Sequence, residues 1–196
     1  LPRFWQYHAD LVKRRAGANE LPEGDFEAPP TIQPEGWKVE DIPSLDEVGY
    51  QAKRVANEPR EGKQCLMLKI APKNPLKPPQ VLERTFLALH SPALRMEPGT
   101  VVRISAWMRV PAPIIGSPDG ALLFDSAGGE PLAVRTSLPS PWKQFILYRT
   151  VPVSGTIDVT VALSGIGTVY FDDIRIEPMG AKESSEIRTT SARSQR

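Results

Sequence analysis

Residues 165–178, which read GIGTVYFDDIRIEP, constrain the fold of this chain more than any other stretch. β-Branched and aromatic residues dominate the stretch, which is typical of a β-strand. The apolar residues on the two sides of the pair Asp172 and Asp173 differ in parity, with Val169 and Phe171 before it and Ile174 and Ile176 after it. A β-bulge exchanges the two faces of a strand in this way. We therefore expect one long strand whose register breaks at the two aspartates.

Short alternating segments separated by proline-rich connections predict an antiparallel β-sandwich for the rest of the chain. The chain holds 21 prolines, which cluster between the segments and mark loops rather than central strands. No amphipathic helices alternate with the segments, which excludes a parallel α/β sheet. The expected strands are residues 21–27, 36–40, 49–56, 64–71, 81–89, 100–110, 121–125, 131–136, 142–151, 156–164 and 165–178.

Residues 100–110 form the clearest expected strand and pose a question about its outer face. The core-facing positions are Val102, Ile104, Ala106, Met108 and Val110. The opposite face carries Trp107 between Arg103 and Arg109, together with Ser105. A tryptophan flanked by arginines on the non-core side indicates a face that is either covered by a loop or open to a ligand. By contrast, Trp37 and Trp142 begin strands and are expected to pack in the core or at its rim.

The ends of the chain are expected to lie outside the β domain. Residues 4–15 show helical spacing of apolar side chains, and Gly17 ends the pattern. We interpret residues 1–18 as a helix or linker from an upstream domain, in which His8 belongs to the packing face. The domain itself is expected to span residues 19–178. Residues 179–196 are nearly all polar or charged, which predicts a disordered tail.

Charge and hydropathy exclude several kinds of partner. The chain has 24 Lys and Arg against 23 Asp and Glu, with no dense basic stripe, so a nucleic-acid partner is not expected. No apolar run reaches the roughly 18 residues that a membrane helix needs, so no membrane insertion is expected. The single Cys65 lies in an apolar run, which predicts a buried free thiol.

Catalytic motifs are missing from the sequence. Neither G-x-S-x-G nor H-E-x-x-H occurs, and the two histidines and one cysteine are widely separated. We therefore expect no enzymatic activity. A hydrolase or lyase that uses paired carboxylates is the alternative, with Glu83, Asp119, Asp125 and Asp158 as the side chains that would have to meet.

Two motifs resemble those of a known family. Residues 165–178 resemble the closing strand G-x-V/I-Y-F-D-D-V/I-x-I/L of galactose-binding-like β-jelly-roll domains, which include carbohydrate-binding modules attached to xylanases and cellulases. Residues 19–27, NELPEGDFE, followed by Gly36 and Trp37, resemble the opening N-L-x-x-N-G-D-F-E and G-W of the same modules. The resemblance implies an all-β jelly-roll sandwich.

The resemblance also implies a function. It implies a non-catalytic module of a larger secreted or cell-envelope protein, which binds a polysaccharide on one sheet face. Sugar rings stack on aromatic side chains, and guanidinium and hydroxyl groups bind their hydroxyls. The candidate ligand residues are Trp107, Arg103, Arg109 and Tyr148, with Arg84 and Arg135 as outer candidates if their strands share the sheet. The alternative is a structural or protein-interaction jelly roll in which Trp107 lies under a loop and no sugar site exists.

Calcium is the one cofactor that the resemblance implies. In these modules the first and last strands commonly share a structural calcium ion. The matching positions here are Glu27 and the pair Asp172 and Asp173, with Asp25 as a further candidate. Calcium takes 6 to 8 oxygen ligands, which carboxylates and carbonyls supply. The alternative is that these carboxylates cap turns or pair with Arg175 and bind no ion.

Overall fold

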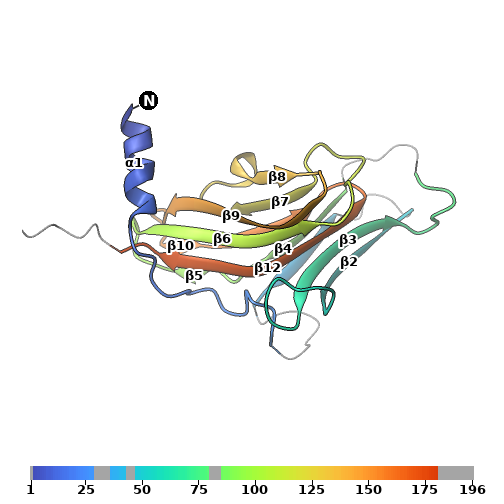
Figure 1. The fold of residues 1–196 in the computed structure, drawn as a ribbon, viewed down its shortest axis with the longest axis horizontal. Coiled ribbons are helices and arrows are strands. Elements are labelled where there is room, and N and C mark those ends of the chain that lie inside the picture. Colours follow the sequence, from blue (N-terminus) through green and yellow to red (C-terminus); the bar gives the residue numbers. More distant parts are fainter. Residues whose placement is uncertain (1, 29–35, 43–46, 80–84, 181–196) are drawn as a thin grey trace, which may run out of the picture.

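Two five-stranded antiparallel sheets pack face to face in the computed structural model (Figure 1), which describes residues 2–28, 36–42, 47–79 and 85–180. The first sheet has the order β1 (Lys38–Ile42), β4 (Phe86–His90), β11 (Val159–Leu163), β7 (Ala121–Asp125) and β8 (Val134–Thr136). The second sheet has the order β2 (Val48–Val55), β3 (Cys65–Pro72), β12 (Gly167–Pro178), β6 (Val101–Val110) and β9 (Ser140–Thr150). The predicted all-β sandwich is confirmed.

The smaller elements lie around the two sheets. β5 (Leu94–Arg95) pairs with β10 (Thr156–Ile157) as a short ribbon, and the 3-10 helix η1 (Glu130–Leu132) lies between β7 and β8. The helix α1 (Pro2–Val12) rises from the end of the sandwich at which β12 ends (Figure 1). No helix among the described residues is long and apolar enough to cross a membrane.

The core lies between the two sheets, where the inward side chains of both interdigitate. The five predicted core positions of β6, Val102, Ile104, Ala106, Met108 and Val110, are all buried there. Trp37 is buried in the same core, as predicted, and its ring tilts against that of Phe26 at 5.6 Å between centroids. A smaller buried cluster of Cys65, Met67 and Tyr170 lies on the outer face of the second sheet.

The predicted register break in the last strand is confirmed. β12 pairs with β6 from Tyr170 to Asp172 and again from Arg175 onward, with a shift between them. Asp173 lies inside the shift with a φ of 48°, a left-handed conformation that aspartate tolerates better than most side chains. As a result Phe171 and Ile174 both face the core although their parities differ.

The opening motif is a turn and not the strand predicted at residues 21–27. Glu23 and Phe26 have φ values of 52° and 58°, which no strand accommodates. The turn lies against β12, because Ile174 N donates to Gly24 O at 2.9 Å. Phe26 is fully buried and fills the core from this turn.

Several other element boundaries differ from the prediction. The helix ends at Val12 instead of residue 15, and the predicted strand 156–164 divides at Asp158 into β10 and β11. The predicted hairpin of 121–125 with 131–136 exists, but its second strand begins only at Val134, because residues 130–132 form η1. Residues 81–84 of the predicted strand 81–89 lie outside the described residues.

Residues near the two ends of the domain are hydrogen-bonded to each other. Ala16 pairs with Met179, Gly17 N donates to Pro178 O, and Gly180 N donates to Arg15 O. Residues 15–17 and 179–180 are therefore bonded to one another, and the rest of the predicted tail, 181–196, lies outside the described residues. The side chain of His8 lies outside them too.

Candidate functional site on the second sheet

The four predicted ligand residues project from the outer face of the second sheet but gather at two places along it. Trp107 and Arg109 lie toward one end of β6, and Arg103 lies opposite Tyr148 of β9 toward the other end. Arg103 and Arg109 are six residues apart, which is roughly 20 Å at about 3.4 Å per residue. The two groups therefore cannot contact one sugar ring together.

A loop that joins β2 to β3 lies across this face. We call its residues 57–64 the strap; it contains no helix or strand. The Arg60 guanidinium lies 4.3 Å from the centroid of the Trp107 ring, and Asn57 Nδ2 donates to the Tyr170 hydroxyl at 2.9 Å. Trp107 is half-buried, and one face of its ring is taken by Arg60.

Beside the strap lies an open pocket of about 600 Å³ with mostly apolar walls. It is lined by Trp142, Arg109 and Glu58. The other lining residues lie around the end of β6 and the start of β9: Val110, Pro111, Pro139, Ser140 and Pro141. Trp142 is half-buried and packs against the Tyr170 cluster, which leaves part of its ring toward the pocket. An indole next to charged hydrogen-bonding groups is the combination that sugar rings require.

Four contacts hold the Arg109 guanidinium in place. Its Nη1 donates to Glu58 Oε2 at 2.8 Å and its Nη2 donates to Asn57 O at 2.9 Å. Its guanidinium carbon lies 4.3 Å from the Tyr170 ring centroid and 5.5 Å from that of Trp142. Two hydrogen bonds and two aromatic contacts fix its orientation at the pocket, while the Glu58 side chain remains 80% exposed.

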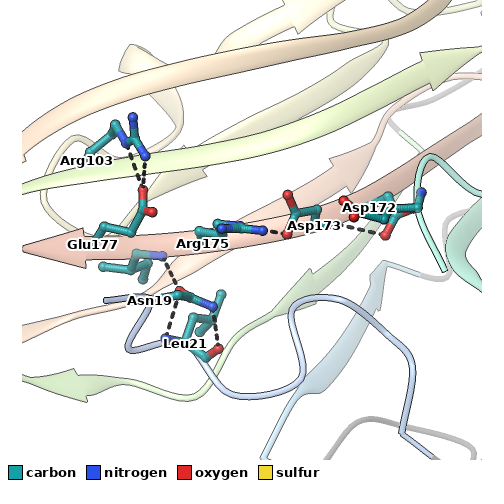
Figure 2. A network of polar contacts seen from close by, with 9 residues as sticks. Asn19, Leu21, Arg103, Asp172, Asp173, Arg175 and Glu177 are labelled. Atoms are coloured by element: carbon teal, nitrogen blue, oxygen red, sulfur yellow. Dashed lines mark hydrogen bonds and ion pairs between the residues drawn. The ribbon is translucent and has the colours of Figure 1, made fainter. Parts of the chain in front are cut away.

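The other group of predicted ligand residues forms a separate ion pair. Arg103 Nε and Nη2 both contact Glu177 Oε2 at 2.7 Å, across the β6–β12 pairing (Figure 2). The Glu177 side chain is 6% exposed and that of Arg103 is 32% exposed. The charge of Arg103 is therefore compensated within the sheet.

The carboxylates predicted to bind calcium line a second pocket, of about 270 Å³. Its lining residues are Asp25, Glu27, Glu61, Gly62, Asp172, Asp173 and Arg175. Glu27 Oε1 accepts hydrogen bonds from Lys63 N and Gln64 N at 2.7 and 2.8 Å. Asp173 Oδ1 accepts one from Arg175 Nε at 2.7 Å, as Figure 2 shows. The pairing with Arg175 is one of the two alternatives left open by the sequence.

Asp172 is the most buried of these carboxylates. Its Oδ2 accepts from Arg60 N and Glu61 N at 2.8 and 3.2 Å, and its Oδ1 accepts from Asp173 N. Burial raises the pKa of Asp172 to about 6, and the three backbone donors oppose part of that increase. Asp173 in turn raises the pKa of the Arg175 guanidinium.

In this arrangement the hydrogen bonds of these carboxylates come from protein donors. Among the described residues, no three side chains of His, Cys, Asp or Glu are grouped closely enough to hold a metal ion. Backbone N–H groups and Arg175 supply the positive ends that a cation would otherwise supply. Calcium stays a prediction from the resemblance.

The remaining candidate residues are dispersed. Arg135 belongs to β8 of the first sheet and pairs with Asp119, so it does not share the sheet of Trp107 as its candidacy required. Arg84 and Glu83 lie outside the described residues. Of the carboxylates named for a hydrolase, Asp125 is buried and pairs with Arg149, and Asp119 pairs with Arg135 of β8.

Sequence reasoning missed two residues of the pocket. Trp142 was interpreted as packing, and Glu58 was not considered, because it lies in a loop with no motif. Trp142 Nε1 donates to Glu58 O at 3.1 Å, 84 residues away in sequence. Parity predicted that Trp107 and Arg109 face outward, but no sequence signal showed that the strand starting near Trp142 is the neighbour of β6.

Comparisons with solved structures place the fold among carbohydrate-binding modules. The structure of TmCBM61 in complex with β-1,4-galactotriose is 19% identical, with a TM-score of 0.54, and the match covers 82% of this chain and 98% of that one. The structure described as "CBM4 structure and function" is 14% identical, with a TM-score of 0.52, covering 81% and 99%. No protein-family model matches the chain, and no curated protein matches it.

One similar structure belongs to a catalytic protein. The enzymatically active domain of tailspike protein 4 from bacteriophage CBA120 is 12% identical, with a TM-score of 0.55. The match covers 82% of this chain but 21% of that one. The chain thus has the fold of β-sandwich carbohydrate-binding modules, and at these identities the likeness concerns the fold alone.

Proposed function

We propose that this chain is a non-catalytic carbohydrate-binding module that binds a polysaccharide in the pocket beside the strap. The observation that carries the proposal is the open pocket in which the Trp142 ring lies beside a fixed Arg109 and an exposed Glu58. Trp142 provides an apolar face for a pyranose ring. Arg109 donates to ring hydroxyls, and the Glu58 carboxylate accepts hydrogen bonds from them.

The fold supports the same proposal. Two of the similar structures are carbohydrate-binding modules, and one of them binds β-1,4-galactotriose. We propose that the chain works as part of a larger secreted or cell-envelope protein, in which it raises the local concentration of the polysaccharide near a partner domain. Such binding needs no organic cofactor.

One observation favours a second candidate function, a jelly roll used for scaffolding or protein contacts. The strap lies over Trp107 and Tyr170, and Arg60 covers one face of the Trp107 ring. A covered sheet face is what a scaffold requires. The pocket at Trp142 remains open beside the strap, and for this reason we rank sugar binding first.

A binding experiment on the full chain separates the two functions. The wild type is tested against β-1,4-galactan, xylan and mixed-linked β-glucan by pull-down and then by calorimetry. Trp142→Ala is expected to weaken binding at least about tenfold, since a buried aromatic anchor carries much of a binding energy. Trp142→Phe keeps a ring and is expected to lose less. Trp5→Ala removes an exposed tryptophan of α1, far from the pocket, and is the matched control.

The outcomes differ for each function. Loss of binding in Trp142→Ala but not in Trp5→Ala supports the pocket. Loss in Trp107→Ala alone moves the site along β6 to the original candidate. Absence of binding by the wild type to any of the polysaccharides removes the proposal and leaves the scaffold.

A further inference from the structure

We infer that Glu27 and Asp172 are positioning residues for the sugar pocket, which they control by holding the backbone of the strap in place. The inference rests on the proposed function for its effect on binding, but its structural part is measured without any ligand. Neither carboxylate lines the pocket that contains Trp142. Both therefore act through the strap.

The first half of the strap builds one wall of the pocket. Glu58 O accepts the hydrogen bond of Trp142 Nε1, and the Glu58 carboxylate accepts one from Arg109. Asn57 O accepts a second hydrogen bond from Arg109. The orientation of both the indole and the guanidinium at the pocket thus depends on where the strap lies.

The second half of the strap is attached by two carboxylates. Arg60 N and Glu61 N donate to Asp172, and Lys63 N and Gln64 N donate to Glu27. Within the described part of the chain, these four are the hydrogen bonds that the strap backbone N–H groups make, and no backbone–backbone hydrogen bond involves residues 57–64. The backbone of the second half of the strap, residues 60–64, therefore depends on those two acceptors for a defined position.

The local geometry of the strap is adapted to Glu27. Gly62 has a φ of 68°, and a Cβ atom there would lie 2.3 Å from Glu27 Oε1. Glycine adopts this backbone conformation without strain and leaves room for the carboxylate. The close approach lets one carboxylate oxygen accept from the amides of both residues that follow.

Fixing the strap before the ligand arrives favours binding. A wall that is disordered in the free protein must be ordered when the sugar binds, which weakens the affinity. Hydrogen bonds to ionised carboxylates are stronger than those between neutral groups, so Glu27 and Asp172 suit this task. Loss of either is expected to weaken binding about tenfold without changing any group that touches the sugar.

Amide hydrogen exchange in the ligand-free protein tests the structural part. Glu27→Ala removes the acceptor and is expected to speed exchange of the Lys63 and Gln64 amides at least about tenfold. Glu27→Gln keeps an amide oxygen that accepts from both, so it is expected to restore most of the protection. If Glu27 instead bound calcium, Glu27→Gln would lose protection as Glu27→Ala does, because glutamine lacks the charge that attracts the ion.

A second variant reaches the same contact without changing a charge. Gly62→Ala displaces the strap from Glu27 and is expected to speed exchange of the same two amides and to weaken binding of the galactan, xylan or glucan that the wild type binds. Gly99→Ala is the matched control, because Gly99 also has a positive φ, of 86°, but has nothing within 4 Å of the added Cβ. The control therefore measures the effect of alanine at a positive φ without any new steric contact. Asp172→Ala removes the acceptor of the Arg60 and Glu61 amides and is expected to speed exchange of those two.

The results decide between the explanations. Protection unchanged in both Glu27→Ala and Gly62→Ala overturns the inference. Equal loss in Glu27→Gln and Glu27→Ala, with faster exchange in wild type after chelator treatment, also overturns it and assigns the strap to a bound cation. Faster exchange combined with unchanged affinity removes the positioning role. A wild type that binds no polysaccharide ends the proposed function, and the exchange data then report on the position of the strap alone.

Discussion

At the scale of single residues, the free thiol is protected by its surroundings. Cys65 is fully buried on the outer face of β3, and its Sγ donates to Val55 O at 3.7 Å. Burial, followed by the nearby Asp172 charge, raises the pKa of the Cys65 thiol to about 12. We expect no alkylation of the native protein by iodoacetamide between pH 7.5 and 9.5, a range in which an exposed cysteine with a pKa of about 8.5 ionises.

Mass spectrometry after timed labelling checks this prediction. Unfolded protein in guanidinium chloride is the control and should be labelled fully at the same pH. Rapid labelling of the native chain at pH 8 would show that the Cys65 cluster opens often or that the thiolate is stabilised.

Two ion pairs of similar length are expected to differ in their effect on stability. Arg149 Nε contacts Asp125 Oδ2 at 2.7 Å, and Arg109 Nη1 contacts Glu58 Oε2 at 2.8 Å. The Asp125 side chain is 0% exposed and also accepts from the amides of two loop residues, whereas Glu58 is 80% exposed. Asp125→Ala should lower the free energy of unfolding by about 3 kcal/mol, because it removes the carboxylate from the largely buried Arg149 and leaves two loop amides without an acceptor.

The exposed pair is the matched control. Glu58→Ala should cost less than about 1 kcal/mol, as exposed ion pairs do. Urea unfolding of both variants measures the difference. Similar costs for the two variants would contradict the assignment of Asp125 as a buried loop anchor.

The residues of the site show which contacts a sequence pattern predicts and which it does not. Parity alone put Trp107 and Arg109 on the outer face of β6, and both lie there. Parity does not show what covers that face, because Arg60 reaches Trp107 from a loop 47 residues earlier. Such contacts depend on how the strap folds over the sheet, which no local pattern encodes.

At the scale of elements, the bulge of β12 was predictable and the turn that packs on it was not. Alternation of apolar residues over twelve positions reveals a change of face directly. Residues 21–27 hold two large apolar side chains, Leu21 and Phe26, at positions of opposite parity, so no apolar alternation distinguishes a strand from a turn there. Pro22, Gly24 and Asp25 are typical turn residues, but the left-handed positions are Glu23 and Phe26, which no turn pattern assigns to them.

A glycine in that turn should be sensitive to substitution. A Cβ atom on Gly24 would lie 2.0 Å from Ile174 O, the carbonyl of a core residue in β12. Gly24→Ala must move the turn away from the strand and break the hydrogen bond from Ile174 N to Gly24 O. We expect a loss of about 2 to 3 kcal/mol, measured by thermal or urea unfolding.

Gly49→Ala is the matched control for that substitution. Gly49 lies in β2, and an added Cβ would meet its nearest atom at 3.9 Å, which is ordinary contact. The alanine should be neutral or slightly stabilising. A Gly24→Ala protein as stable as Gly49→Ala would show that the turn does not pack tightly on β12.

At the scale of the whole molecule, the sequence predicted the sandwich but not which strands share a sheet. Turn spacing and alternation are local and indicate many short antiparallel strands. The order β2-β3-β12-β6-β9 joins strands that are far apart in the chain. For that reason the sequence did not exclude Arg135, which lies on β8 of the other sheet. It also did not predict the pocket between β6, β9 and the strap.

The boundary of the domain is the last property of the whole molecule that the structure makes testable. The sequence placed it at residue 19, but Arg15 and Gly17 are already hydrogen-bonded to the final residues of the domain. Asn19 continues this attachment, since its side chain bonds Leu21 and accepts from Ile176 N (Figure 2). We therefore expect the folding unit to begin near residue 15.

Two truncations measure that boundary. Removing residues 1–13 deletes a helix whose described side chains are mostly exposed, apart from Leu11, so it should cost about 2 kcal/mol, the value of one buried leucine. Removing residues 1–20 also deletes the hydrogen bonds of Arg15, Gly17, Asn19 and Glu20, and at about 1 kcal/mol each it should cost roughly 4 kcal/mol more. Calorimetry of the two shortened chains gives the difference directly. Equal melting temperatures would place the boundary after residue 20, because the segment 14–20 would then contribute nothing to the stability of the sandwich.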